Sequence, residues 1–163
     1  MQDMQTAIRR AMTSGTVVGL GIAAATALAG KRETGSAAAP LNATSHIVWG
    51  DEAALQDAPS LKYTLTGFVL NHAAAIFWAA VYEKVFGADS ARSSPHAALL
   101  RPLIGGAVVS AGAYLTDYYL VPKRLTPGFE KRLSGKSLAT VYALLAIGLA
   151  ATELIAHSTR RPS

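Results

Sequence analysis

The chain has 163 residues, of which 51% are apolar and only 15% are charged, and it contains no cysteine. Soluble domains usually carry about 25% charged residues, so this composition favours a membrane protein, and the lack of cysteine excludes disulfides, thiolate metal sites and cysteine nucleophiles. The net charge of +5 comes from basic residues that lie between apolar segments. We therefore expect anionic lipid headgroups as partners, and no nucleic acid.

The first apolar segment is residues 13–30, an uncharged stretch preceded by two arginines. Its length predicts a membrane-spanning helix, although a basic start and an apolar run with small residues at its end also describe a cleaved signal peptide. Gly15, Gly19 and Ala23 recur every four residues, as small residues do where membrane helices pack closely. We expect this face to contact another helix.

The loop over residues 31–62 contains a segment, 40–58, that is apolar enough to lie on or dip into the membrane. Pro40 can begin a short helix there, and Gly50 can close it in a left-handed conformation. Asp51 can cap a second short helix. The loop thus predicts an interfacial helical segment.

Two further interpretations of this loop stay open. The triplet 42–44 matches a glycosylation sequon, although such triplets are frequent by chance. His46, Trp49 and Asp51 are candidates for an enzyme site that acts on a lipid or quinone. This enzymatic alternative rests on those three residues alone.

The second span is expected at 63–86, because its first twenty residues, up to Tyr82, carry no formal charge. Twenty residues at 1.5 Å rise cross a hydrocarbon core of about 30 Å. Glu83 marks the exit into water, and Asn71 and His72 form one polar step near the centre. An ionisable residue at such a depth is a candidate for function.

The third and fourth spans are expected at 99–121 and 137–156, with a bend at Pro102. Between them, segment 126–135 has apolar residues four apart and predicts a second short interfacial helix, with Phe129 towards the acyl chains. Five cations in and beside this segment are expected to face anionic headgroups: Lys123, Arg124, Lys131, Arg132 and Lys136.

These elements predict an all-α protein, a single integral membrane domain over 1–163. Its fold is expected to be a bundle of four transmembrane helices, with two short interfacial helices in the loops after the first and third spans. Lys and Arg are divided almost evenly between the two sides, and the cluster at 123–136 tilts the orientation towards cytoplasmic loops.

Antiparallel spans would bring several polar residues to one depth. Tyr114 lies level with His72, and Tyr142 lies opposite Asp117. A shared polar cluster is therefore possible, in which the histidine and the aspartate depend on each other. The alternative is a neutral His72 bonded to a backbone carbonyl and an Asp117 that reaches the interface. The candidate cluster comprises Asn71, His72, Tyr114, Asp117, Tyr118 and Tyr142.

No metal or other cofactor is expected. A haem held by two histidines needs both at one depth on facing helices. His157 lies several turns from the level of His72, and His46 and His96 lie in loops, so haem is disfavoured. No phosphate loop, nucleophile elbow or metalloprotease helix is present.

Three blocks, at 42–54, 61–87 and 116–134, resemble small, uncharacterised bacterial inner-membrane proteins. The resemblance covers about a third of the chain and implies a location in that membrane but no activity. In size and charge balance the chain also resembles small multidrug transporters and fluoride channels. It differs from them in two ways, because its first span has no acidic residue and its first loop is long.

The sequence favours a non-enzymatic membrane protein that acts through helix packing, as a homo-oligomer or as an accessory subunit of a membrane complex. Small residues on every span and the lack of a catalytic set support this interpretation. The alternative is a small transporter or a proton or ion pathway that uses a buried His72 and Asp117.

Overall fold

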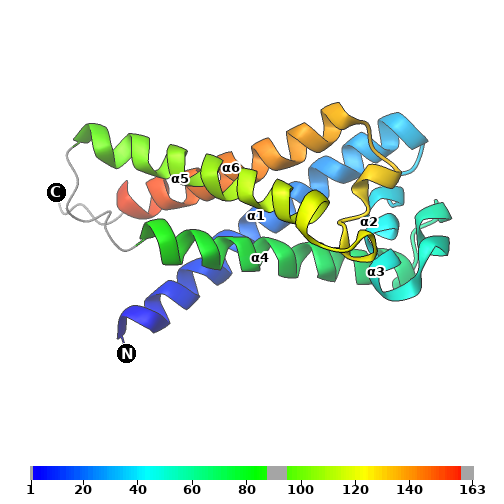
Figure 1. The fold of residues 1–163 in the computed structure, drawn as a ribbon, viewed down its shortest axis with the longest axis horizontal. Helices are drawn as coiled ribbons and strands as arrows, with labels where there is room; N and C mark the ends of the chain where they lie inside the picture. The colour runs from blue at the N-terminus through cyan, green and yellow to red at the C-terminus, as the bar shows by residue number, and fades with distance from the viewer. Residues whose placement is uncertain (1, 88–94, 159–163) are drawn as a thin grey trace.

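The computed structural model describes residues 2–87 and 95–158, and within those ranges it is helical with no strand. Four long helices lie antiparallel: α1 (Gln2–Thr34), α4 (Thr66–Phe86), α5 (Pro95–Leu115) and α6 (Gly135–Ser158) (Figure 1). Each belongs to a helical stretch long and apolar enough to cross a membrane: Met4–Thr34, Leu61–Phe86, Leu99–Leu120 and Gly135–Ala156. The predicted all-α fold with four membrane-length helices is confirmed.

Charged residues bound the uncharged part of every long helix. At one end of the bundle each helix contributes one such residue: Arg10, Glu83, Arg101 and Glu153. At the other end the boundary residues are Lys31, Lys62, Asp117 and Lys136. Since charges avoid the hydrocarbon core, these two sets mark the limits of the stretches that are apolar enough to cross a membrane.

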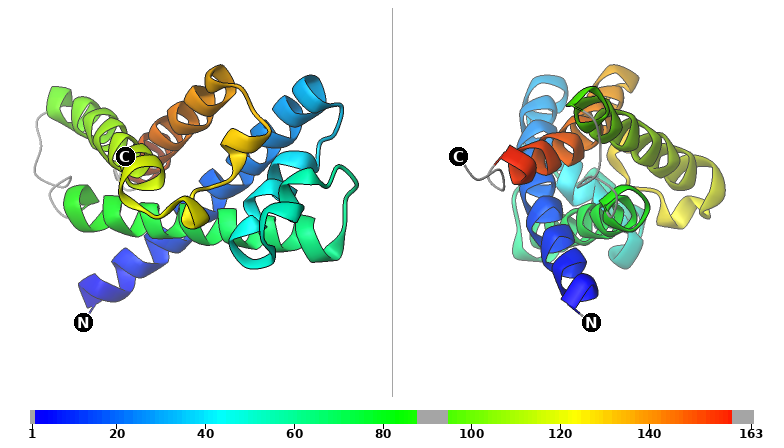
Figure 2. Two further views of the ribbon diagram at one scale, coloured as in Figure 1. Left: turned by 45° about the vertical axis from the view of Figure 1, so that its right-hand side comes forward. Right: turned by 90° about the vertical axis from the view of Figure 1, so that its left-hand side faces the viewer.

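The small residues of α1 lie against α4, which α1 crosses obliquely (Figure 2). A Cβ on Gly15 would lie 2.5 Å from the Cα of Ile76, and one on Gly19 would lie 3.0 Å from Nδ1 of His72. Such close approach is what small residues permit between membrane helices. The predicted contact face of α1 is therefore used within the chain.

The other two long helices also pack through a glycine. A Cβ on Gly106 of α5 would lie 2.3 Å from the carbonyl oxygen of Ala146 on α6. α1 and α6 join the two helix pairs, and Val18, Ile22 and Leu145 form part of the buried core between them. α4 and α5 share fewer contacts with each other, so the bundle is less tightly packed on that side.

The two long loops pack together over one end of the bundle, on the right of Figure 1. We call residues 36–60 and 121–134 the cap. The cap contains two short α-helices, α2 (Ala39–Thr44) and α3 (His46–Trp49), and 3-10 turns at Asp51–Leu55, Lys123–Leu125 and Phe129–Lys131. π-helical turns at Leu61–Leu65 and Thr116–Leu120 connect it to α4 and α5.

The cap differs from the predicted interfacial helices. Segment 40–58 breaks at Ser45 into α2 and α3, and α2 is buried in the protein. Gly50 ends α3 with φ +81° and ψ −179°, which is not the left-handed helical conformation. Segment 126–135 is interrupted by Gly128, at φ +83°, and does not form one helix. Phe129 and Leu133 pack against protein, whereas Val48 and Trp49 of the first segment are exposed.

Phe129 shows this difference most clearly, because it is only 4% exposed and belongs to the hydrophobic core. Leu133 is buried in the same core. An apolar stripe in a loop predicts burial but does not say whether lipid or protein provides it. Here the partner is the rest of the cap and the bundle, and the placement of Phe129 towards acyl chains was wrong.

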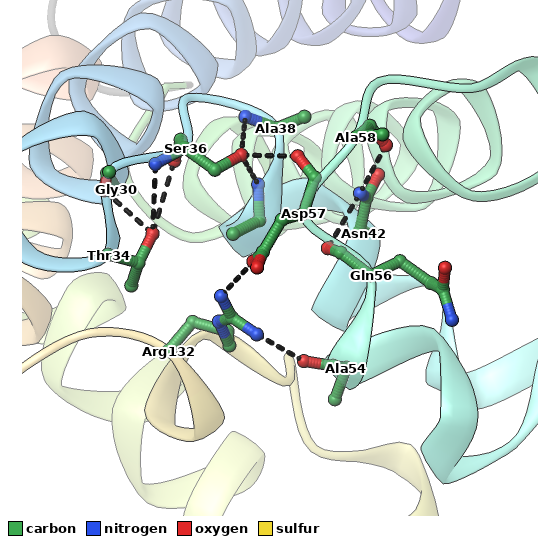
Figure 3. A network of polar contacts seen from close by, with 12 residues as sticks. Gly30, Thr34, Ser36, Ala38, Asn42, Ala54, Gln56, Asp57, Ala58 and Arg132 are labelled. Atoms are coloured by element: carbon green, nitrogen blue, oxygen red, sulfur yellow. Dashed lines mark hydrogen bonds and ion pairs between the residues drawn. The ribbon is translucent and has the colours of Figure 1, made fainter.

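Buried polar contacts hold the cap together (Figure 3). Asn42, with no exposed surface, donates from Nδ2 to the carbonyls of Gln56 at 2.9 Å and Ala58 at 3.0 Å. Its Oδ1 accepts from the Thr64 hydroxyl at 2.6 Å. The sequon triplet 42–44 is thus buried, and its asparagine is fully engaged.

Glycines let both the bundle and the second loop of the cap approach α2 closely. A Cβ on Gly67 of α4 would lie 1.7 Å from the carbonyl oxygen of Leu41, and one on Gly128 would lie 2.5 Å from that of Ala43. A third glycine, Gly30 of α1, lies against the ring of Pro40. No larger residue fits at Gly67 without moving α2.

Candidate binding cavity beneath the cap

A cavity of about 150 Å³ lies between the cap and the bundle. Apolar side chains from the cap, α1, α4 and α6 form most of its wall, and Trp78 provides an aromatic surface. Its polar side chains are Thr44, Asn71, Asp117 and Tyr142. Among the described residues that line it, Asp117 is the only charged one.

The Asp117 carboxylate is held by the fourth span. The Tyr142 hydroxyl on α6 donates to Oδ2 of Asp117 at 2.7 Å. Asp117 lies in the π-helical turn that follows α5, which places it at the edge of the apolar part of the span. A carboxylate beside an apolar cavity can bind a cationic or hydrogen-bond-donating group.

Aromatic rings surround this contact. Tyr118 and Tyr142 have ring centroids 6.1 Å apart, and Tyr114 lies 5.2 Å from each of them. The hydroxyl of Tyr118 lies 3.4 Å from Oε2 of Glu130 in the cap. The structure therefore brings four of the six candidate cluster residues together, namely Tyr114, Asp117, Tyr118 and Tyr142.

Asn71 and His72 take different places, although they are adjacent in α4. Asn71 lines the cavity and donates from Nδ2 to the carbonyl of Gly19 at 3.2 Å. His72 instead meets α1, where its Nε2 lies 3.3 Å from the Thr16 hydroxyl, and its ring stacks on Phe68 at 5.8 Å. Its Nδ1 is buried without a hydrogen-bond partner.

No described contact joins His72 to Asp117, although the sequence predicts that the two belong to one cluster. The described contacts of His72 are with α1 and its own helix, whereas those of Asp117 are with α6. Their predicted depths differ by about one helical turn, and successive positions of α4 point about 100° apart, so Asn71 and His72 face different neighbours. Asn71 faces the cavity and His72 does not line it.

The three loop candidates all make structural contacts within or beside the cap. His46 is 2% exposed, and its Nδ1 lies 2.8 Å from the Ala43 carbonyl, while Nε2 is buried without a partner. Trp49 donates from Nε1 to the Lys62 carbonyl at 3.0 Å. Asp51 accepts from Nζ of Lys131 at 2.5 Å. Asp51 lines a described cavity at the surface of the cap, and His46 and Trp49 do not line that cavity.

Two acids at the outer surface of the cap have altered acidity. A hydrogen bond from Lys131 holds the pKa of Asp51 below its ordinary value of 3.8, and the charge of Lys131 adds to the effect. A hydrogen bond from Tyr63 lowers the pKa of Glu52 in the same direction, with help from Lys62. Both acids are exposed and suit a folded cap with ionised carboxylates.

The five cations expected to face lipid divide into two groups. Lys131 pairs with Asp51, and Arg132 pairs with Asp57 and donates to the Ala54 carbonyl (Figure 3). These two therefore tie the second loop to the first. The other three are exposed on the surface, namely Lys123, Arg124 and Lys136.

A second, more polar cavity of about 360 Å³ lies at the opposite end of the bundle. Arg10 and Glu83 form an ion pair beside it at 3.7 Å, and the Tyr82 hydroxyl donates to Glu153 within the bundle. From the sequence, Glu83 marks the exit of the second span into water and is level with Arg101 across the short turn, so that the two are expected to form an interfacial pair and not a cavity. The sequence does contain a signal for this site, because each of the four long helices carries a charged residue near the end of the bundle opposite the cap.

Nothing in the described part of the chain suggests a metal centre, since no three histidine or acidic side chains there gather closely enough to hold an ion. The side chains of His96 and His157 lie outside the described residues. Comparisons with protein-family models, with curated proteins and with solved structures gave no match.

Proposed function

We propose that the protein is a non-enzymatic membrane protein that binds a small lipophilic amine in the cavity beneath the cap. The observation that carries this proposal is a single carboxylate, Asp117, in the wall of an otherwise mostly apolar cavity. An apolar cavity of about this size holds a benzene-sized molecule. The carboxylate then favours a ligand with one ammonium group.

The surrounding side chains support this ligand class. Tyr142 fixes one oxygen of Asp117, so the carboxylate keeps its position before a ligand arrives. Trp78 contributes an aromatic face to the cavity, and such faces attract organic cations. Of the helix pairs that are neighbours along the bundle, α4 and α5 share the fewest contacts, so that side is the proposed route of entry from the bilayer.

The test compares two probes of similar size, benzylamine and toluene. In a Trp49→Phe background, Trp78 is the only tryptophan and reports on the cavity. We expect saturable quenching by benzylamine and an affinity loss of about tenfold or more in Asp117→Asn, because a hydrogen bond to a charged group is lost. Toluene binding should change little in this variant.

The matched control is Asp57→Asn, which removes an acid of the cap that does not line the cavity. It should leave both probes unaffected. Equal affinities of benzylamine for the Asp117→Asn variant and the unchanged protein would refute the proposal. Equal affinities for benzylamine and toluene in the unchanged protein would refute it as well.

A transport role remains the second proposal, and it now depends on Asp117 without His72. The specific observation in its favour is that a ligand in this cavity lies close to the end of the spans, beside the cap. A proteoliposome flux assay with benzylamine separates the two roles. Uptake down a proton gradient would indicate transport, and binding without uptake would indicate a binding protein.

We also propose which lipids the protein meets, which membrane contains it and what role helix packing has. The exposed cap cations Lys123, Arg124 and Lys136 would attract anionic headgroups at about 1 kcal/mol each. A bacterial inner membrane is the proposed location. The protein could also act by packing its helices against a second copy or against a larger membrane complex. Gly15 and Gly19 do not support this role, because they already pack against α4 within the chain.

A further inference from the structure

The polar cavity opposite the cap contains two arginines and two glutamates from three different helices. Arg9 and Arg10 come from α1, Glu83 from α4 and Glu153 from α6. The hydroxyl-bearing Thr152 also lines it. The charges in its wall therefore balance, which distinguishes it from a site for a simple anion or a simple cation.

The polar groups of this cavity are held in place. The Glu83 side chain is 9% exposed and pairs with Nη1 of Arg10, and Glu153 is buried and accepts from Tyr82. Nε of Arg10 is enclosed and has no hydrogen-bond partner. Leaving a buried donor unsatisfied is costly, so an acceptor that reaches Nε would lower the energy of the site.

The cavity also lies at the depth of lipid headgroups. Arg10, Glu83 and Glu153 are the residues at which three uncharged helical stretches end. Val17, one turn along α1 from the cavity residue Thr13, is 55% exposed. A molecule with its polar part in the cavity would therefore meet apolar helix surface on the bilayer side.

We propose that this cavity binds the headgroup of a zwitterionic phospholipid with a primary amine, such as phosphatidylethanolamine. The phosphate lies towards Arg9 and Arg10, since guanidinium groups bind phosphate with paired hydrogen bonds. The ammonium lies towards Glu83 and Glu153. A purely anionic headgroup brings no ammonium for the two carboxylates to bind, and so fits the site less well.

The amine should decide the selectivity. Three N–H donors of a primary ammonium can bond to carboxylates, whereas the trimethylated ammonium of phosphatidylcholine has no donor. We expect phosphatidylethanolamine to bind about tenfold more tightly than phosphatidylcholine. Phosphatidylglycerol, which has the phosphate but no ammonium, should also bind more weakly.

The experiment measures the melting temperature of the purified, delipidated protein in mild detergent while each of the three lipids is added. Native mass spectrometry counts the lipids retained. We expect one retained phosphatidylethanolamine and the largest rise in melting temperature for this lipid, because a ligand that binds only the folded state stabilises it. Soluble phosphoethanolamine, added at the same concentration, should have little effect.

Variants locate the site. Glu153→Gln should abolish the preference for phosphatidylethanolamine over phosphatidylcholine, and Arg10→Gln should weaken both lipids. Thr152→Leu adds an apolar side chain to the wall of the cavity and keeps every charge, so it tests the site even where a charge variant fails to fold. Thr140→Leu is its matched control, because Thr140 lies on α6 near the cap and, like Thr152, bonds to a carbonyl of its own helix.

Three outcomes would overturn the proposal. Equal melting shifts with phosphatidylethanolamine and phosphatidylcholine would exclude recognition of the ammonium. A full effect of phosphatidylethanolamine on Thr152→Leu would place the lipid elsewhere. An effect of soluble phosphoethanolamine equal to that of the lipid would show that the ligand is a small water-soluble molecule. The benzylamine experiment addresses the other end of the bundle, so either result stands without the other.

Discussion

At the cap end of the bundle, the fully buried Asn42 makes three hydrogen bonds, and two of them go to backbone carbonyls of the first loop. At the opposite end, Arg10 lies beside a cavity of about 360 Å³ and keeps its Nε enclosed without a partner. The cap is closed by contacts that only the folded chain can supply. Each end keeps one buried nitrogen without a hydrogen-bond partner, Nε2 of His46 in the cap and Nε of Arg10 at the opposite end, but of the two only Arg10 lines a described cavity, which a ligand can enter.

The difference also concerns backbone packing. The cap rests on close backbone contacts, of which that between Gly67 and the Leu41 carbonyl is the tightest. The ion pair between Arg10 and Glu83, at 3.7 Å, is looser and partly exposed, and such pairs contribute about 0–1 kcal/mol. We therefore expect the stability of the cap to depend on side-chain volume at these close contacts. The stability of the opposite end should depend on its charged side chains and on bound lipid.

The largest expected effect is that of Gly67→Ala. The added Cβ would overlap the Leu41 carbonyl oxygen at 1.7 Å, so α2 must move. We expect a loss of about 3 kcal/mol in the free energy of unfolding, measured by thermal or denaturant unfolding in detergent. Gly21→Ala is the control, because a Cβ there meets nothing within 4 Å. Equal stabilities of these two variants would contradict the packing described for α2.

The next effect is that of Asn42→Ala, which strands two carbonyls and the Thr64 hydroxyl. We expect a loss of about 2–3 kcal/mol in the free energy of unfolding. Asn71→Ala, which removes one described hydrogen bond to Gly19, should cost less. A reversed order of the two variants would mean that the cap is not held by Asn42.

A smaller effect is expected from any coupling between His72 and Asp117. His72 contacts α1 and Asp117 contacts α6, so they share no described partner. In a double-mutant cycle, His72→Phe and Asp117→Asn should therefore add within about 0.5 kcal/mol in the free energy of unfolding. A coupling of several kcal/mol would show instead that the two residues act as one polar cluster.

The smallest effect is expected for Asp51→Asn, which removes an exposed ion pair with Lys131. Because the folded state lowers the pKa of Asp51 below 3.8, its contribution to stability is present above pH 3.8 and is lost as the pH falls through the folded pKa. The small difference in melting temperature between this variant and the unchanged protein should therefore disappear in acid. A difference that grows on acidification would contradict this sign.

The spans could be predicted from the sequence because charge is expensive in hydrocarbon, and the uncharged stretches mark them directly. Relative depth could also be predicted, and it placed Tyr142 opposite Asp117. Depth does not specify the side of a helix, however. Asn71 and His72 have nearly the same depth, yet one lines the cavity and the other meets α1.

The cap could not be predicted, because the apolar and basic residues of its two loops are compatible with two different environments. An apolar residue such as Phe129 beside basic residues suits the headgroup layer, but it equally suits a core under Lys131 and Arg132, whose partners lie in the other loop. The π-helical turn at Thr116–Leu120 also has no clear sequence signature. It shifts the direction in which the following side chains point.

The cap joins two loops that are far apart in the chain, and this sets an order for biogenesis. α1, the first loop and α4 can pair as soon as they are synthesised, because Gly15 and Gly19 meet α4 without help from later residues. Arg132 and Phe129 emerge only after α5. A nascent chain that stops before them would hold a paired first hairpin beneath an unfinished cap, with the surface that receives Phe129 uncovered. Such a partly made chain is a natural substrate for membrane quality control, whereas the completed chain hides that surface.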